Sequence, residues 1–355
     1  MAAGPPNDSL HSHSERQHMS DANRRFLLAE RPTGPVDDNT FNLVSEEIPT
    51  IADGEALVRV KWISIDPTNR MWIGAEPTYL PPVAIGEEMR ALGLGEVVES
   101  KSDDYPVGAI VTGLTGWQDY TVTSASAPLM TVPAGIPVEP QTLLGTLGMT
   151  GCTAYFGMLE IGDPQEGETV VISAAAGAVG SVAGQLAKQR GARVVGIAGG
   201  SEKCAWLVDE LGFDEAVDYK ADDWRAQLKA ATPDGIDVDF ENVGGEIMEA
   251  VFSRLNMNSR VALCGLISGY NDTEPAPGPR TFGNLLVQRV KLQGFIILDY
   301  YARFPEALEA LGAMVAAGTL RTEETVVEGF EQLPSALNML FAGENTGKLV
   351  VHIED

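Results

Sequence analysis

The chain has 355 residues, of which 44% are hydrophobic, and a formal net charge of −26 at pH 7. This length exceeds what one ordinary hydrophobic core supports, so we predict two domains. The acidic balance argues against a nucleic-acid partner, because neutralising phosphates requires a basic face. No apolar run is long enough for a membrane span and no signal-peptide pattern occurs, so neither membrane insertion nor secretion is predicted.

Cysteine and histidine usage restricts the chemistry further. The three cysteines, Cys152, Cys204 and Cys264, are odd in number and far apart in the sequence. This usage favours free thiols in a reducing cytoplasm over a disulfide framework. The four histidines lie near the two ends of the chain, so its body offers none as a metal ligand or as a general base. We therefore expect no metal.

The first part of the chain is predicted to be a β domain that follows a disordered leader. Residues 1–23 are rich in Gly, Pro, Ser and His and show no periodicity, which is typical of disorder. From residue 24 to 145, β-forming runs are punctuated by Pro and Gly, at 26–28, 56–65, 94–99 and 109–112. Such spacing is typical of an antiparallel, barrel-like domain.

Residues 146–318 show a different sequence pattern, in which short apolar runs alternate with amphipathic helical patterns. Strands are predicted at 169–172, 194–197, 236–240, 260–264 and 291–297. This alternation indicates an α/β fold with a doubly wound parallel sheet. Residues 319–355 turn to strands again, at 325–327 and 348–351, around a helix at 334–342. We predict that this last part returns to the first domain.

The strand at 169–172 leads directly into a turn of small residues and then into a helix. Ala174, Gly177 and Gly180 form an A-x-x-G-x-x-G pattern, and the apolar stripe of the helix begins at Val179. Small residues in such a turn let backbone amides approach a pyrophosphate at the helix N-terminus, which predicts a dinucleotide site. The alternative is a tight turn without a ligand.

The next predicted strand ends in Gly199, Gly200, Ser201, Glu202 and Lys203. A site for NAD usually places an acidic residue near this end to bind the ribose 2′-hydroxyl. Here Ser201 as N-cap would leave backbone amides free, and Lys203 supplies a cation, which together suit a 2′-phosphate. We therefore predict NADP as the cofactor. A capped helix with a surface lysine is the alternative, and Glu202 favours it.

Eight stretches distributed along the chain after the leader match one family in order. They are W-I-S-I-D-P-T-N-R-M (62–71), L-G-M-T-G-C-T-A-Y-F-G-M-L-E-I-G (147–162), A-A-A-G-A-V-G-S-V-A-G-Q (174–185), V-V-G-I-A-G-G-S-E-K-C (194–204), P-D-G-I-D-V-D-F-E-N-V-G-G (233–245), C-G-L-I-S-G-Y-N (264–271), L-Q-G-F-I-I-L (292–298) and G-E-N-T-G-K-L-V-V (343–351). Through them the chain resembles the zinc-independent medium-chain dehydrogenases/reductases. The resemblance is to the branch of prostaglandin and leukotriene B4 reductases, plant double-bond reductases and bacterial NADPH-dependent curcumin reductases, of which the last look nearest.

This resemblance implies a Rossmann domain inserted in a GroES-like β-barrel domain, with the active site between the two. It also implies which positions contact NADPH, with the pyrophosphate over 177–180, the 2′-phosphate at Lys203 and Tyr219, and the nicotinamide end beneath Asn345. For Asn345 a plain turn between helix and strand is the alternative. The implied cofactor contacts are Met149, Thr153, Gly177, Ala178, Val179, Gly180, Gly200, Ser201, Lys203, Tyr219, Asn242, Cys264, Gly265, Leu266, Ile267, Ser268, Phe295, Ile296, Ile297 and Asn345.

The implied reaction is the NADPH-dependent reduction of the C=C bond of α,β-unsaturated ketones or aldehydes, with hydride added to the β-carbon. The enolate that forms needs a hydrogen-bond donor, and a tyrosine hydroxyl can serve. The resemblance points to Tyr270 and Tyr300 as catalytic residues and to Thr68, Asn69, Tyr270 and Tyr300 as the substrate pocket. A packed or surface tyrosine is the alternative for each. Thr68 departs from the family, which often carries a tyrosine there.

Two other functions stay open at this point. Quinone reduction would use the same fold and cofactor, and a protein that binds NADPH without catalysis could act as a redox sensor. The resemblance implies a homodimer joined through the Rossmann domains and a small-molecule substrate, with no nucleic acid or membrane as partner. The region 86–88 lacks the histidine that zinc-dependent relatives use, which again predicts metal-free chemistry.

Overall fold

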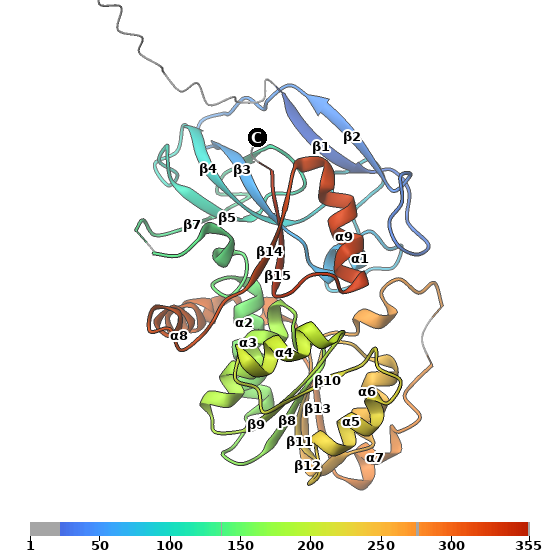
Figure 1. Ribbon diagram of the computed structural model, residues 1–355. Helices are drawn as coiled ribbons and strands as arrows, with labels where there is room; N and C mark the ends of the chain where they lie inside the picture. The colour runs from blue at the N-terminus through green and yellow to red at the C-terminus, as the bar shows by residue number, and fades with distance from the viewer. Residues whose placement is uncertain (1–21, 136, 275–276, 354–355) are drawn as a thin grey trace, which may run out of the picture.

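The computed structural model describes residues 22–135, 137–274 and 277–353. The leader predicted at residues 1–23 therefore lies almost entirely outside the described residues. Two large sheets organise the described part, one above the other in Figure 1, and a two-stranded ribbon accompanies the upper one. One is parallel and the other is mainly antiparallel, which confirms the predicted fold class.

The upper sheet of Figure 1 combines strands from both ends of the described chain. Its order is β14-β15-β3-β4-β5-β7, and β6 also pairs with β3. The pairs are antiparallel apart from β14 and β15. Because β15 lies beside β3, the C-terminal segment returns to the first sheet. The strands are β3 (Ala56–Ser64), β4 (Leu92–Ser100), β5 (Ile110–Leu114), β6 (Tyr120–Thr123), β7 (Met130–Thr131), β14 (Glu324–Glu328) and β15 (Lys348–His352).

An aromatic core joins this sheet to a two-stranded ribbon, β1 (Asn23–Leu28) and β2 (Phe41–Glu46). The Phe26 ring stacks on Phe330 with centroids 5.3 Å apart and meets Trp117 edge-on at 5.9 Å. All three side chains are buried. Burying three such rings together supplies a large share of the local stabilisation, since each removes a large apolar surface from water. This core holds the C-terminal helix region against the N-terminal strands.

The lower sheet is parallel, in the order β10-β9-β8-β11-β12-β13. Counted from its first strand this is 3-2-1-4-5-6, so successive strands are added on one side of β8 and then on its other side, beginning with β11. Doubly wound sheets bind ligands at this switch point between β8 and β11. The strands are β8 (Thr169–Ile172), β9 (Arg193–Ala198), β10 (Glu215–Asp218), β11 (Ile236–Glu241), β12 (Leu255–Leu263) and β13 (Lys291–Gly294).

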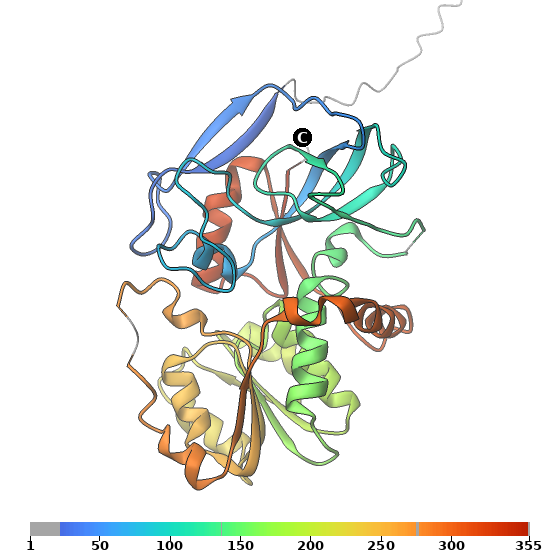
Figure 2. The ribbon, with the colours of Figure 1, turned by 180° about the vertical axis from the view of Figure 1, so that it is seen from behind.

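Helices cover both faces of this sheet, and Figure 2 shows the arrangement from behind. Val170 and Ile172 pack in one cluster with side chains of α3, whereas Val171 packs in another with side chains of α5 and α6. This split follows from the alternation of side chains along a strand. The helices are α1 (Pro67–Trp72), α2 (Met149–Phe156), α3 (Ala178–Gln189), α4 (Ser201–Asp209), α5 (Trp224–Ala231), α6 (Gly245–Phe252), α7 (Gly283–Val287), α8 (Phe304–Ala316) and α9 (Leu333–Ala342).

Three local predictions differ from the structure. The strand predicted at 291–297 ends at Gly294, because the chain leaves the sheet there and begins the short helix η4 (Ile297–Arg303). The strand predicted at 260–264 begins earlier, at Leu255. Ser201 is the first residue of α4 and not its N-cap, which is Gly200 with φ 97°, a left-handed conformation that glycine adopts without strain.

Candidate active site

A cavity of about 530 Å³ lies where the carboxyl ends of the parallel strands meet the upper sheet. The residues that follow β8, β9, β11 and β12 line one side, and residues of α1 and of the segment after it line the other. Most of the lining is apolar, including Met71, Leu92, Leu114 and Leu298. A concave, mainly apolar space with a few polar groups at a topological switch point is the usual form of a ligand site.

The turn between β8 and α3 forms a cradle at one end of the cavity. Ala174 adopts a left-handed φ of 48°, and the Gly177 amide donates a 3.0 Å hydrogen bond to its carbonyl. A Cβ at Gly180 would come within 2.5 Å of the Ala174 carbonyl oxygen, so this position requires glycine. The amino end of α3 thereby lies against the turn, and Ala178 and Val179 line the cavity. This arrangement fits a pyrophosphate.

The C-terminal segment crosses this cradle. The Gly347 amide donates a 2.8 Å hydrogen bond to the Ala176 carbonyl, and Gly347 forms a parallel bridge with Gly177. Asn345 is buried, and its side-chain amide donates to the Gly347 carbonyl at 2.9 Å. Both the turn interpretation of Asn345 and its predicted place at the cavity are therefore compatible with the structure, since it lines the cavity as well.

Lys203 extends toward the same C-terminal segment. Its ammonium donates to the carbonyls of Gly343, at 2.8 Å, and Asn345. Burial lowers the pKa of Lys203, and the nearby Lys220 lowers it further. Two cations close to one another favour an anion between or beside them. Tyr219 also lines the cavity at this end, so the geometry suits a phosphate group beyond the end of β9.

Asn242 joins the ends of β8 and β11 at the switch point. Its backbone amide donates to Ser173 Oγ and its side-chain amide to the Ser173 carbonyl, both at 2.7 Å. Next to it, burial and then Glu241 raise the pKa of the Cys264 thiol to about 12. That thiol stays protonated at neutral pH, so Cys264 is not a nucleophile. Cys264 lines the cavity as an apolar wall.

The Tyr270 hydroxyl has a defined orientation at the cavity. Its oxygen accepts a 3.1 Å hydrogen bond from the Leu266 amide. Burial raises the pKa of Tyr270, so the phenol keeps its proton. An amide that donates to the oxygen leaves the phenolic O–H free to donate elsewhere. Because Tyr270 lines the cavity, this hydroxyl can donate to an oxygen of a bound molecule.

The loop that carries Tyr270 is tied to the other half of the molecule. The buried Arg70 of α1 donates to Asn271 Oδ1 at 2.9 Å and to the Gly34 carbonyl at 3.1 Å. At the start of the same helix, Lys348 forms a 2.9 Å ion pair with Asp66, and both side chains are largely buried. These contacts hold α1 and the Tyr270 loop in one arrangement around the cavity.

Most of the residues predicted to form the site come together at this cavity. It is lined by Thr68, Met149, Thr153, Gly177, Ala178, Val179, Gly180, Lys203, Tyr219, Asn242, Cys264, Gly265, Ile267, Tyr270, Phe295, Ile296, Ile297 and Asn345. Six others do not line it: Asn69, Gly200, Ser201, Leu266, Ser268 and Tyr300. Of these, Leu266 contributes through its amide to Tyr270, and Ser268 donates to the Val243 carbonyl at 2.6 Å.

Asn69 and Tyr300 have different surroundings from those that the resemblance implied. Asn69 is fully buried, accepts a 2.7 Å hydrogen bond from the Asp66 amide and thereby caps α1. The Tyr300 ring stacks on Phe156, with centroids 4.7 Å apart, and meets Phe295 edge-on at 6.4 Å. In this structure Asn69 and Tyr300 support the walls of the cavity and do not contact its interior.

Tyr79 lines the cavity and was missed by sequence reasoning. It lies in the segment after α1, and its hydroxyl shares a hydrogen bond with Thr68 Oγ1. The only sequence signal was the unusual Thr68 itself, whose partner cannot be read from the chain. The contact that joins them depends on how the segment folds back over α1.

Two acidic side chains lie buried beneath the site. No hydrogen-bond partner is found among the described residues for either carboxylate oxygen of Asp239, which is fully buried. Burial raises the pKa of Asp239, and the neighbouring Glu241 raises it further. The folded state therefore holds a proton that the unfolded state releases, so stability falls as the pH rises above about 4, the ordinary pKa of an aspartate, toward the raised value.

Replacing Asp239 with asparagine is expected to make the free energy of unfolding less dependent on pH. The free energy of unfolding of the variant should rise relative to that of the wild type as the pH increases above about 4, since position 239 then has no carboxyl that must stay protonated. Urea unfolding at several pH values measures this. Asp234→Asn, at an exposed turn, is the matched control. A difference in the free energy of unfolding between wild type and Asp239→Asn that does not change with pH would contradict the prediction.

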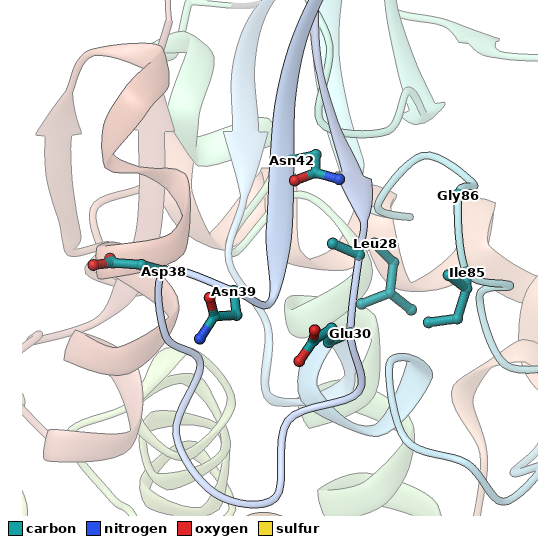
Figure 3. A pocket seen from close by; sticks show the side chains of 8 residues that line it. Leu28, Glu30, Asp38, Asn39, Asn42, Ile85 and Gly86 are labelled. Atoms are coloured by element: carbon teal, nitrogen blue, oxygen red, sulfur yellow. The ribbon is translucent and has the colours of Figure 1, made fainter.

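A second hollow, of about 400 Å³, lies on the outside of the upper half, between β1, the β1–β2 connection and residues 85–86. Figure 3 shows that the Asp38 side chain points away from that of Glu30, so the two carboxylates do not converge.

No group of three or more potential metal ligands occurs among the described residues. In that part of the chain, none of the helices has the length and apolar character needed to cross a bilayer.

Comparison with known proteins adds an independent line of observation. Residues 24–132 match the family described as the N-terminal domain of oxidoreductase, and residues 178–313 match the zinc-binding dehydrogenase family. The chain is 43% identical to the NADPH-dependent curcumin reductase of Escherichia coli, over 93% of this chain and 97% of that protein. It is 38% identical to the NADP⁺-dependent 2-alkenal reductase of Nicotiana tabacum, over 94% and 98%.

A solved structure is similar over the same extent. The complex of CurA from Vibrio vulnificus with NADPH superposes with a TM-score of 0.89 at 42% identity, covering 94% of this chain and 99% of that one.

Proposed function

We propose a reaction for this chain, which belongs to the double-bond reductase branch of the medium-chain dehydrogenase/reductase family: the NADPH-dependent reduction of the C=C bond of α,β-unsaturated ketones and aldehydes. One observation carries the proposal. The protonated hydroxyl of Tyr270 lies at the same mainly apolar cavity as the cradle at the amino end of α3. A donor for a developing oxyanion and a site for the reductant therefore share one space.

The residues at the cradle fit NADPH. Gly180 and Gly177 leave room for the pyrophosphate at the amino end of α3, and Lys203 with Tyr219 would bind the 2′-phosphate. Asn242, Thr153 and the segment 295–297 would surround the remainder of the cofactor. When bound, the cofactor supplies the hydride that is added to the β-carbon of the substrate.

The chain's own residues then stabilise the charge that develops. The apolar walls exclude water, which strengthens each electrostatic contact inside. Tyr270 donates a hydrogen bond from Oη to the carbonyl oxygen as this oxygen becomes an enolate, and the Leu266 amide keeps the phenol in that orientation. The α-carbon is protonated afterwards, either from Tyr270 or from water. Tyr300 acts indirectly, by holding Phe295 at the cavity wall.

Turnover of a small panel of acceptors tests this proposal. The purified protein is incubated with NADPH and 3-nonen-2-one, 4-hydroxynonenal or curcumin, and the products are identified. A saturated ketone or aldehyde supports the proposal. Reduction of quinones alone would replace it with quinone reductase activity, and tight NADPH binding without turnover of any acceptor would indicate a redox sensor.

We also propose a division of the chain into two domains and a cellular compartment for the protein. Residues 24–145 and 319–355 form the GroES-like catalytic domain and 146–318 the NADP-binding domain. The pairing of β15 with β3 supports this division. Three unpaired cysteines support a cytoplasmic location. Limited proteolysis checks the division, because cuts should concentrate near residues 145 and 319 when the cofactor is absent.

We also propose a homodimer that forms through the parallel sheet. Among the described residues, β13 is the last strand of that sheet, and Phe282, Leu286 and Val287 beside it expose 62%, 83% and 65% of their surfaces. An open strand edge with exposed apolar side chains favours association with another chain. A second copy fits because it presents the same edge.

Leu286→Glu is expected to shift this dimer toward monomer, since it places a charge on the apolar surface beside β13. Size-exclusion chromatography with light scattering measures the mass of wild type and variant. Met257 is also exposed, and it precedes Asn258, whose amide donates to the Gln288 carbonyl just after α7, so Met257→Glu tests the same surface. A monomeric wild type would contradict the proposed dimer.

A further inference from the structure

Tyr79 places a second phenol at the cavity, on the side opposite the parallel sheet. It belongs to the segment that follows α1, whereas Tyr270 comes from the loop after β12. The site described above uses only Tyr270. A second neutral hydroxyl in the same mainly apolar space requires an explanation, because polar groups at such a place usually determine how a ligand is oriented.

Thr68 holds this phenol in place. Thr68 Oγ1 and the Tyr79 hydroxyl share a hydrogen bond. Among the described residues the Thr68 hydroxyl has no other hydrogen-bond partner, so it can act as the donor in this hydrogen bond, with the Tyr79 oxygen as the acceptor. The phenolic O–H of Tyr79 is then free to donate into the cavity.

The element that carries Thr68 is rigid. Asn69 caps the first turn of α1 through the Asp66 amide, at 2.7 Å, and Asp66 pairs with the buried Lys348 at 2.9 Å. Ser64 also donates to the Asp66 carboxylate. Although Tyr79 lies in a connecting segment, its hydroxyl is therefore fixed by a helix that is anchored to β3 and β15. Sites on such anchored elements keep their geometry better than free loops do.

The electrostatics agree with this role. Burial raises the pKa of Tyr79, and Asp66 raises it too, while the hydrogen bond with Thr68 opposes them. Tyr79 is also among the groups that raise the pKa of Tyr270. Both pKa shifts keep the phenols protonated, and a charge on Tyr79 would make ionisation of Tyr270 still less favourable. A negative oxygen placed between two neutral donors is stabilised by both.

We propose that Tyr79 is a second hydrogen-bond donor to the carbonyl oxygen of the acceptor, oriented by Thr68 and opposite Tyr270. This inference rests on the proposed enone reduction and deepens it. The two phenols form the oxyanion site, and no proton leaves Tyr79 during the step. A tyrosine in place of Thr68 would occupy the space of the Tyr79 hydroxyl. In this chain the Tyr79 hydroxyl, held by Thr68, therefore lies where many family members have the hydroxyl of that tyrosine.

Kinetics of Tyr79→Phe with an enone test the inference. Losing one hydrogen bond to a charged oxygen is expected to lower kcat by about tenfold or more, with the KM for NADPH unchanged. Thr68→Val, which removes only the hydroxyl, should lower kcat by a smaller factor, and Thr68→Ser should restore it. In the Tyr79→Phe background, Thr68→Val should have no further effect, because its only partner at the site is gone.

A binding measurement gives a readout that does not depend on turnover. 4-Nitrophenolate carries on its phenolic oxygen the charge that the enolate carries, and its absorbance reports its ionisation. With NADP⁺ bound, Tyr79→Phe should weaken binding of this anion about as much as it lowers kcat. Tyr301→Phe is the matched control, since Tyr301 is exposed and does not line the cavity.

The outcomes separate this inference from the proposed function. If the wild type reduces the enone while Tyr79→Phe matches it in kcat and in anion binding, the role of Tyr79 is wrong and the reductase function stands. If the wild type reduces no enone, the proposed function fails and this inference fails with it. If Tyr301→Phe lowers kcat and weakens anion binding as much as Tyr79→Phe does, the effect is a general one of removing a tyrosine hydroxyl, and the inference is overturned.

Discussion

Tyr270→Phe is expected to lower kcat for enone reduction about a hundredfold, because a donor aimed at a developing oxyanion contributes on that scale. The cavity walls stay intact, since the ring is kept and only Oη is lost. The KM for NADPH should stay within about twofold, because the proposed function assigns Tyr270 to the carbonyl oxygen of the substrate and the phosphates to the cradle and Lys203. Steady-state kinetics with 3-nonen-2-one and NADPH provide the measurement.

The pH dependence offers a second check on Tyr270. Burial raises its pKa above the ordinary value of about 10, so wild-type kcat should not fall through loss of this proton at any pH below that value. Wild type and Tyr270→Phe could instead both lose activity around neutral pH, with the same pH profile. The group whose deprotonation lowers the rate would then be a residue other than Tyr270. A kcat that Tyr270→Phe leaves unchanged would refute the catalytic role.

Lys203→Ala is expected to raise the KM for NADPH roughly ten- to a hundredfold while changing the KM for NADH little. A charge-assisted contact to phosphate contributes about 1.5–3 kcal/mol, which corresponds to this range. Lys203 is half-buried and close to Lys220, so an anion at this place relieves repulsion between the two cations. Dissociation constants for NADP⁺ and NAD⁺, measured by calorimetry, give the same comparison without turnover.

A structural role for Lys203 would produce a different result. Its ammonium donates to the carbonyls of Gly343 and Asn345, so the substitution could loosen the C-terminal segment over the cradle. In that case both cofactors would be weakened by similar factors, and the assignment to the 2′-phosphate would be wrong. Lys229→Ala, at an exposed position of α5, should leave both dissociation constants unchanged.

The cofactor side of the site could be predicted largely from the chain itself. The strand β8, the turn with Gly177 and Gly180 and the helix α3 are consecutive in sequence, so their pattern already specifies the cradle. Lys203 follows β9 in the same way. The resemblance located the substrate side at Thr68, Tyr270 and Tyr300, but the structure brings only the first two to the cavity.

The position of Tyr300 outside the cavity lining and the omission of Tyr79 have the same origin. Each side chain lies in an irregular segment, where no repeating pattern shows which way it points. Tyr300 stacks on Phe156 of α2, and Tyr79 meets Thr68 of α1. The boundaries of β13 and α4 were missed for a related reason, since tertiary contacts decide where an element ends.

By itself the sequence determined the two kinds of sheet, the dinucleotide cradle and the cation beyond β9, because these depend on residues close together in the chain. Only the tertiary structure decided which hydroxyls line the cavity. Tyr270, Tyr79 and Thr68 come from three separate segments, and their meeting depends on anchors such as Lys348–Asp66 and Arg70–Asn271 that join distant parts of the chain. Hydrogen bonds and packing between such segments form only once the whole chain has folded, so no local pattern encodes them.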